Sequence, residues 1–191
     1  MARKSTLPSV AQVTATLRRK RRAASAACVE AGTRWYPENG ALMERIAQEA
    51  FTATGDPITS GFVAGIVAAF SQNATWKANI TMARNYCLGT GQNGMQRVMD
   101  EIHALEEDAY PPAIFSGLKR GDFWRNLTGD LSAVTCDRWH LRAAFGDRKV
   151  SLTPEVHALV TEATTRVAAE FDEAPATTQA IIWCHVRGTG A

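Results

Sequence analysis

The chain has 191 residues, of which 46% are apolar, and its 21 Lys and Arg side chains nearly balance 19 Asp and Glu side chains. A chain of this length can bury a core that is stable without disulfides or metal, and its balanced composition argues against disorder. No apolar run approaches the roughly 20 residues of a membrane span, and no apolar stretch follows the basic start, so we expect a soluble, cytoplasmic, monomeric protein.

The near-neutral total conceals a basic N-terminus. Residues 1–34 hold eight basic residues and one acidic residue, a charge of +7, so the rest of the chain carries −5. Five of the basic residues are consecutive: Arg18, Arg19, Lys20, Arg21 and Arg22. Such a run is typical of contact with a polyanion such as nucleic acid, and equally of a solvated helix face. We expect residues 1–34 to form a basic segment that packs on a single domain of residues 35–191.

Apolar spacing is helical nearly throughout, so an all-α fold is predicted. A first helix is expected over residues 10–32, and the residues at 35–40 are expected to break it before a helix over 41–54. Asp56, followed by a proline, is a natural N-cap for a helix over residues 58–70. That helix is apolar almost all round, so we expect it to be the central buried helix.

Six further helices and four isolated cysteines complete the chain. The helices are expected over residues 74–87, 95–105, 118–127, 137–145 and 153–171, and from Pro175 onward. The cysteines lack any C-x-x-C spacing, so no metal site and no cofactor is predicted. Cys28, Cys87, Cys136 and Cys184 are instead expected to be small buried residues.

Asp137 is the strongest candidate for a catalytic side chain. It precedes an apolar helix, where the helix dipole and free backbone N–H groups favour an ionised carboxylate. Such a carboxylate can act as a general base or stabilise a developing cation. Simple N-capping of the helix is the structural alternative.

Several stretches resemble a known superfamily. Residues 119–130, followed by 133–140, resemble the helix-hairpin-helix region and catalytic-aspartate helix of the DNA base-excision glycosylases. Residues 62–79 and 179–183 are similar to phage and actinobacterial proteins related to the α-glutamyl/putrescinyl-thymine pyrophosphorylases, which are amino acid:DNA transferases of thymine hypermodification. The resemblance covers about residues 35–187. It implies a helix-hairpin-helix glycosylase-like fold and DNA as the partner. The basic run of residues 18–22 lies outside the resemblance, and we expect it, from its charge, to contact the DNA backbone.

The resemblance also implies roles for individual residues. Asp137 would act on a base extruded from DNA, deprotonating an amine (an amino acid or a polyamine) that replaces the pyrophosphate of an activated 5-hydroxymethyluracil. The expected phosphate or pyrophosphate contacts are Lys119, Arg120, Arg138 and Arg142. Lys119 is also the one nearby lysine that could serve as the nucleophile of a bifunctional glycosylase. A base glycosylase and a non-catalytic DNA-binding module are the alternative functions.

A set of amide and aromatic side chains is expected to hold the base. The set is Gln72, Asn73, Trp76, Asn79, Trp139, Gln179 and Trp183. Each has a structural alternative: Asn73 could cap a helix, the tryptophans could be core residues, and Gln179 could be a satisfied interior amide. His140 and His185 are expected to be structural.

Overall fold

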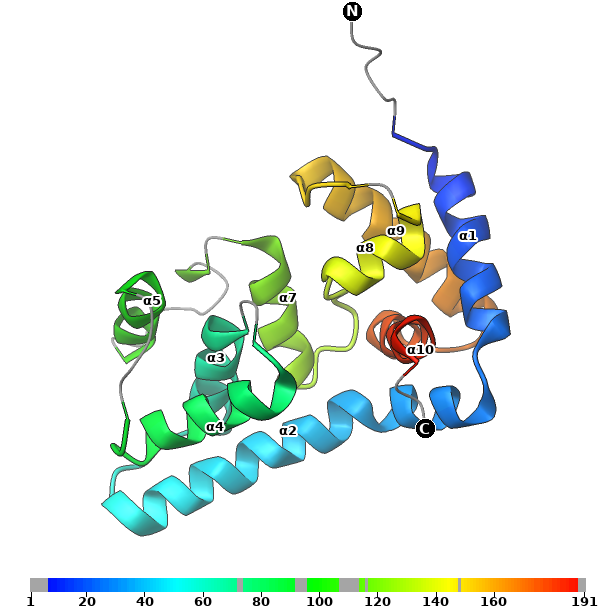
Figure 1. Cartoon of the computed structure of the whole chain (residues 1–191). Coiled ribbons are helices and arrows are strands. Elements are labelled where there is room, and N and C mark those ends of the chain that lie inside the picture. Colours follow the sequence, from blue (N-terminus) through cyan, green and yellow to red (C-terminus); the bar gives the residue numbers. More distant parts are fainter. Residues whose placement is uncertain are drawn as a thin grey trace, which may run out of the picture. The chain divides into compact units, whose positions relative to one another are not determined.

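The computed structural model describes residues 7–71, 74–91, 96–106, 114–115, 117–147 and 149–188, and the regular elements in these ranges are all helices. The all-α class is therefore confirmed. The helices are α1 (Val10–Ala23), α2 (Ala26–Thr54), α3 (Ser60–Phe70), α4 (Trp76–Cys87), α5 (Gln96–Glu106), α7 (Leu118–Leu127), α8 (Arg138–Phe145), α9 (Pro154–Glu170) and α10 (Pro175–Arg187) (Figure 1).

The chain divides into two compact units. Unit 1 comprises residues 1–35 and 131–191, and unit 2 comprises residues 36–130. The first boundary falls inside α2. The expected basic segment of residues 1–34 thus belongs to the same unit as the C-terminal helices, because α1 packs against α8, α9 and α10. Residues 35–191, expected to be one domain, contribute to both units.

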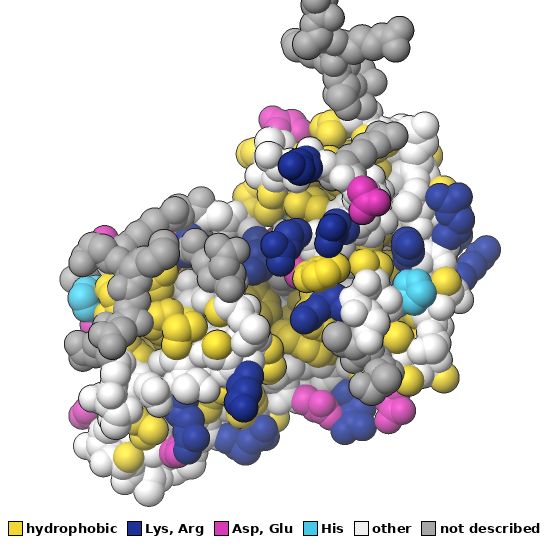
Figure 2. Space-filling view, viewed as in Figure 1, with side chains coloured by type: hydrophobic (Ala, Val, Ile, Leu, Met, Phe, Trp, Pro, Cys, Tyr) yellow, Lys and Arg dark blue, Asp and Glu magenta, His cyan; other side chains and the backbone are white. Residues whose placement is uncertain are grey.

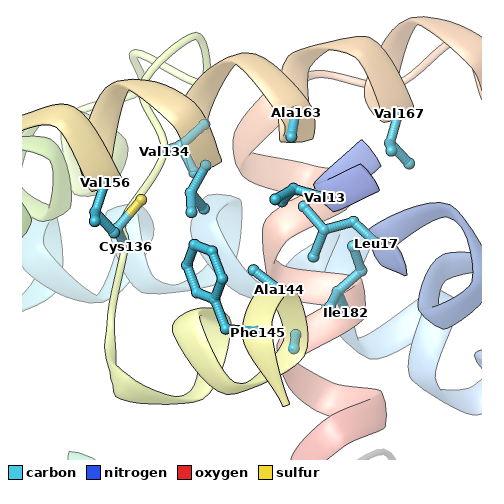
Figure 3. Packing of buried hydrophobic residues seen from close by; sticks show 12 residues of the cluster. Val13, Leu17, Val134, Cys136, Ala144, Phe145, Val156, Ala163, Val167 and Ile182 are labelled. Carbon is cyan, nitrogen blue, oxygen red and sulfur yellow. The ribbon is translucent and has the colours of Figure 1, made fainter. Parts of the chain in front are cut away.

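Unit 1 is built around an apolar core between α1, α8, α9 and α10 (Figure 3). The buried side chains on α9 recur every three or four residues, which is the spacing of one helix face. The residues that meet in this core include Val13 and Leu17 of α1, Val156, Val160 and Val167 of α9, and Ile182 of α10. Because Leu17 directly precedes the basic run and is fully buried, α1 is part of the core.

The first expected helix is two helices in the structure. α1 ends at Ala23, and α2 begins at Ala26. The hydroxyl of Ser25 accepts a hydrogen bond from the backbone N–H of Cys28 at 3.2 Å, so Ser25 caps α2. The prediction of one helix over residues 10–32 was wrong because alanine-rich sequence favours helix on both sides of this cap. The basic run consequently lies in the last turns of α1, where the helix dipole favours cations.

The predicted break at residues 35–40 was also wrong. α2 continues through Pro37, although a proline in a helix interior costs about 3 kcal/mol. Burial of Tyr36 and Met43 on the same helix offsets this cost. Within unit 1, a Cβ added to Gly32 would lie 2.5 Å from the Cα of Ile181, so this part of α2 lies directly against α10. Tertiary packing rather than local propensity keeps α2 continuous.

Unit 2 has α3 at its centre, as expected. α3 packs against α4, α5 and α7, and residues 63–70 are all buried. A Cβ on Gly65 would lie 2.9 Å from the side chain of Leu105, so the small residue admits a close neighbour. The helix begins later than predicted, because the hydroxyl of Thr59, and not Asp56, accepts the backbone N–H of Phe62 at 3.1 Å. Threonine offers the same capping oxygen three residues further on.

The later helices follow the predicted boundaries closely. Asp137 and Thr153 are the N-caps of α8 and α9, and Thr75 caps α4. α7 ends at Leu127, shortly before Gly129, whose φ of 98° is in the left-handed region. Within the described ranges, none of the helices combines the length and apolar character that crossing a membrane requires.

Candidate functional site

Arginine and tryptophan side chains converge on α8 and α10 of unit 1. The guanidinium carbons of Arg138, Arg142 and Arg187 lie 5.9, 5.2 and 5.8 Å from the ring centroid of Trp139. The same carbon of Arg187 lies 4.4 Å from the ring centroid of Trp183. These separations are within the range of cation–π attraction. We call these five residues the arginine–tryptophan cluster.

Helical spacing brings the cluster together. Arg138 and Arg142 are four residues apart on α8, and Trp183 and Arg187 are four residues apart on α10, so each pair shares one helix face. The two helices pack against each other. The cluster is therefore carried by packed helices, which position side chains more precisely than loops do.

Asp137 connects the two helices of the cluster. One carboxylate oxygen, Oδ1, accepts the backbone N–H of His140 at 2.7 Å, which confirms Asp137 as the N-cap of α8. The other, Oδ2, accepts the indole N–H of Trp183 at 2.9 Å. Two N–H donors and the helix dipole all favour the ionised carboxylate. Asp137 is thus a fixed negative charge that also orients Trp183.

The arginines of the cluster differ from two arginines of α1 in their charged neighbours. Arg138, Arg142 and Arg187 are exposed, and no acidic side chain in the described ranges pairs with them. Arg18 and Arg21 of α1, by contrast, form ion pairs. In Figure 2, basic side chains gather around apolar ones in the region of α8 and α10. The three guanidinium groups therefore place positive charge next to the aromatic rings of Trp139 and Trp183.

His140, on α8, is a fully buried core residue. Its Nε2 lies 2.9 Å from the hydroxyl oxygen of Thr164, and that hydroxyl donates its own hydrogen to the carbonyl oxygen of Val160 at 2.8 Å. Nε2 of His140 must therefore carry a hydrogen and donate it. Burial lowers the pKa of His140 to about 4, so the imidazole is neutral at pH 7.

The basic run of α1 is only partly available to a ligand. Arg18 pairs with Glu170, the last residue of α9, and Arg21 pairs with Glu173, which lies between α9 and α10. The Arg21 guanidinium also lies 4.6 Å from the ring centroid of Phe171. These guanidinium groups hold α1 to the end of α9 and the turn after it, and their expected contact with DNA stays a prediction. The exposed members of the run are Arg19, Lys20 and Arg22.

Lys119 and Arg120 lie in the first turn of α7, in unit 2. Arg120 is 4% exposed and forms a two-pronged ion pair with buried Glu101 of α5. The expected phosphate contact of Arg120 is corrected for this reason. Nζ of Lys119 donates to the carbonyl oxygen of Ser71, the C-cap of α3, at 3.2 Å. Lys119 and Asp137, the two expected catalytic residues, belong to different units.

The base-binding candidates of α4 also belong to unit 2. Trp76 is half-buried and meets Phe123 edge-to-face, with ring centroids 6.3 Å apart. Asn79 is buried, and its Oδ1 has no hydrogen-bond partner in the described part of the chain. Gln72 and Asn73 lie outside the described residues. The roles of these four residues stay predictions.

Of the two base-binding candidates on α10, one is buried and the other is partly exposed. Gln179 is 3% exposed, which favours the interior-amide alternative. Trp183 is half-buried and belongs to the cluster. Arg187 is the member that sequence reasoning missed. Its signal was present, because it follows Trp183 by four residues, the same spacing that linked Arg138 to Arg142.

The cysteines are structural. Cys28, Cys87, Cys136 and Cys184 are all buried and free, as expected. In the part of the chain that the structure describes, no three His, Cys, Asp or Glu side chains are grouped so that they could hold a metal ion.

A comparison with known protein families assigns almost the whole chain to one family. A family model, described as a family of unknown function (DUF7178), matches residues 1–190. The chain belongs to the DUF7178 family. No curated protein and no solved structure matches it. The cluster and Asp137 are therefore the basis on which a function can be assigned to this DUF7178 protein.

Proposed function

We propose that this protein binds DNA at the arginine–tryptophan cluster and modifies a thymine-derived base held there. Three arginines converge on the indole ring of Trp139, and none of them pairs with an acidic side chain among the described residues. Guanidinium groups bind phosphate oxygens with two parallel hydrogen bonds, and indole rings stack on bases. A simple anion would use the arginines but not the rings, so the combination fits a nucleotide better.

The reaction we assign is the replacement of pyrophosphate by an amine, on a glycosylase-like helix-hairpin-helix fold. The amine nitrogen forms a bond to the methylene carbon of an activated 5-hydroxymethyluracil, and the pyrophosphate leaves with the electron pair of the broken C–O bond. Arg138 and Arg142 stabilise the charge on the departing pyrophosphate, and Asp137 takes up the proton that the amine releases. The support for this step is the resemblance of residues 62–79 and 179–183 to relatives of the thymine-modifying transferases, together with the arginines around Trp139.

A non-catalytic DNA-binding module is the second candidate. It is favoured by one observation: both carboxylate oxygens of Asp137 already accept hydrogen bonds, from the backbone of His140 and the indole of Trp183. Those bonds give Asp137 a complete structural role. In this case the cluster binds DNA and no bond is made or broken.

One experiment separates these functions. The full chain is incubated with DNA that contains thymine, 5-hydroxymethyluracil or its pyrophosphorylated form, with amino acids or polyamines, and the nucleosides are analysed by mass spectrometry. A new amine adduct supports the transferase. Abasic sites would instead indicate a glycosylase, and bound but unaltered DNA would indicate the module. Absence of DNA binding would contradict the whole proposal.

Substitution Asp137→Asn tests the catalytic role. The amide keeps an oxygen for the His140 N–H, but its NH₂ group would face the indole N–H of Trp183. We expect product formation to fall by about 100-fold or more and the free energy of unfolding to fall by about 1–2 kcal/mol. The matched control is Asp147→Asn, an exposed aspartate just after α8, which should change neither quantity. Full activity in Asp137→Asn would leave Asp137 as a cap only.

A further inference from the structure

Three tryptophans of unit 1, Trp139, Trp183 and Trp35, form a series, and the guanidinium group of Arg187 lies near the first two rings. The guanidinium of Arg187 lies near the rings of both Trp139 and Trp183, at 5.8 and 4.4 Å. The ring centroid of Trp183 is in turn 6.1 Å from that of Trp35, with the two planes inclined at 58°. Three helices, α8, α10 and α2, thus each contribute one indole ring to the series.

The rings of this series are partly exposed, and a hydrogen bond fixes the central one. Trp35, Trp139 and Trp183 are each partly exposed to solvent. The orientation of Trp183 is held by its hydrogen bond to Asp137. Ordered aromatic surface beside exposed guanidinium groups needs little further ordering when a flat ligand stacks on it, so less conformational entropy is lost on binding.

Unpaired nucleotides are the ligands that can use every part of this surface. Their bases offer free π-faces for indole and guanidinium planes, and their phosphates can be neutralised by arginines. In an intact duplex the bases are already stacked on one another, so a duplex could use the arginines but not the rings.

Resting on the DNA binding proposed above, we infer that the arginine–tryptophan cluster, extended by Trp35, is a stacking platform for unpaired nucleotides. Single-stranded DNA, or an unpaired stretch of a duplex, is then the preferred substrate. The arginines set the dependence of affinity on salt, and the rings set the preference for unpaired strands.

The test compares affinities for a labelled oligothymidine strand and for a duplex of the same length, by fluorescence anisotropy at several salt concentrations. The substitution Trp139→Leu removes the ring and keeps apolar bulk. We expect it to weaken single-strand binding roughly 10-fold or more while duplex affinity changes less than about twofold. The control is Arg166→Gln, which removes an exposed, ion-paired arginine of α9 and should leave both affinities unchanged.

A second measurement needs no substitution. Stacking on the cluster should quench the indole fluorescence of the unaltered protein more strongly with the single strand than with the duplex. Equal affinity and equal quenching for the two forms would overturn the inference, and so would an equal loss of both affinities in Trp139→Leu. If duplex DNA were bound or modified without any preference for unpaired strands, the proposed function would survive and only this inference would fail. Absence of binding to both forms would end both.

Discussion

The starts of α7 in unit 2 and α8 in unit 1 carry similar residues in different environments. Arg120 of α7 is buried and paired with Glu101. Arg138 and Arg142 of α8 are exposed beside Trp139, without an acidic partner in the described ranges. From the sequence, all three arginines are expected to contact phosphate. An acidic side chain on another helix therefore decides whether a cation supports the fold or can bind a ligand.

The largest expected effect comes from breaking the pair at α7. Arg120→Met would leave the Glu101 carboxylate buried without its partner, so we expect the free energy of unfolding to fall by about 3–5 kcal/mol. Urea unfolding measures this loss. The double variant Glu101→Leu with Arg120→Met should recover most of the stability, because an apolar pair needs no charge compensation. The exposed Arg45 provides the control Arg45→Met. A loss below about 1 kcal/mol in the single variant would mean that this pair does not hold α7.

A smaller effect is expected on the α8 side as the pH falls. Burial lowers the pKa of His140 from 6.5 to about 4, so the unfolded chain binds a proton that the folded chain does not bind between these values. Stability is complete above pH 6.5 and falls as the pH decreases towards 4, by up to about 3 kcal/mol. Unfolding measured from pH 7 to 5 should show this slope, and His140→Leu should remove it. A flat profile in the unaltered protein would contradict the neutral, buried state of His140.

The smallest effect on stability is expected in the cluster itself. Replacing Arg138, Arg142 and Arg187 together by Gln should change the free energy of unfolding by no more than about 0.5 kcal/mol per site, because exposed side chains without ion pairs support little. The same variant should bind DNA more weakly, and the slope of log affinity against log salt should fall by about two to three. A large loss of stability with an unchanged salt slope would make these arginines structural, like Arg120.

Local sequence signals predicted most helix ends, and they failed at Ser25 and Pro37. The caps Asp137 and Thr153 lie where the sequence places them, since a capping side chain acts within its own helix turn. Ser25 was missed because alanine-rich sequence favours helix on both sides of it. Pro37 favours a break because proline is costly in an isolated helix, and only the burial around α2 offsets that cost.

The candidate site was predictable only where its residues lie close together in the sequence. Asp137, Arg138 and Arg142 could be placed together because they lie within six residues, on one short helix and its N-cap. The addition of Arg187 required the packing of α10 on α8. The removal of Arg120 required the position of Glu101, which is distant in the sequence.

The sequence by itself determined the helical class, most helix ends, the buried character of α3 and the cap at Asp137, because these depend on residues within one or two helix turns. Only the tertiary structure decided that α2 passes through Pro37, that Arg18, Arg21 and Arg120 are bound in ion pairs, and that Trp139 lies among three exposed arginines. Burial and ion pairing join residues far apart in the chain, and no local pattern records which of them will meet.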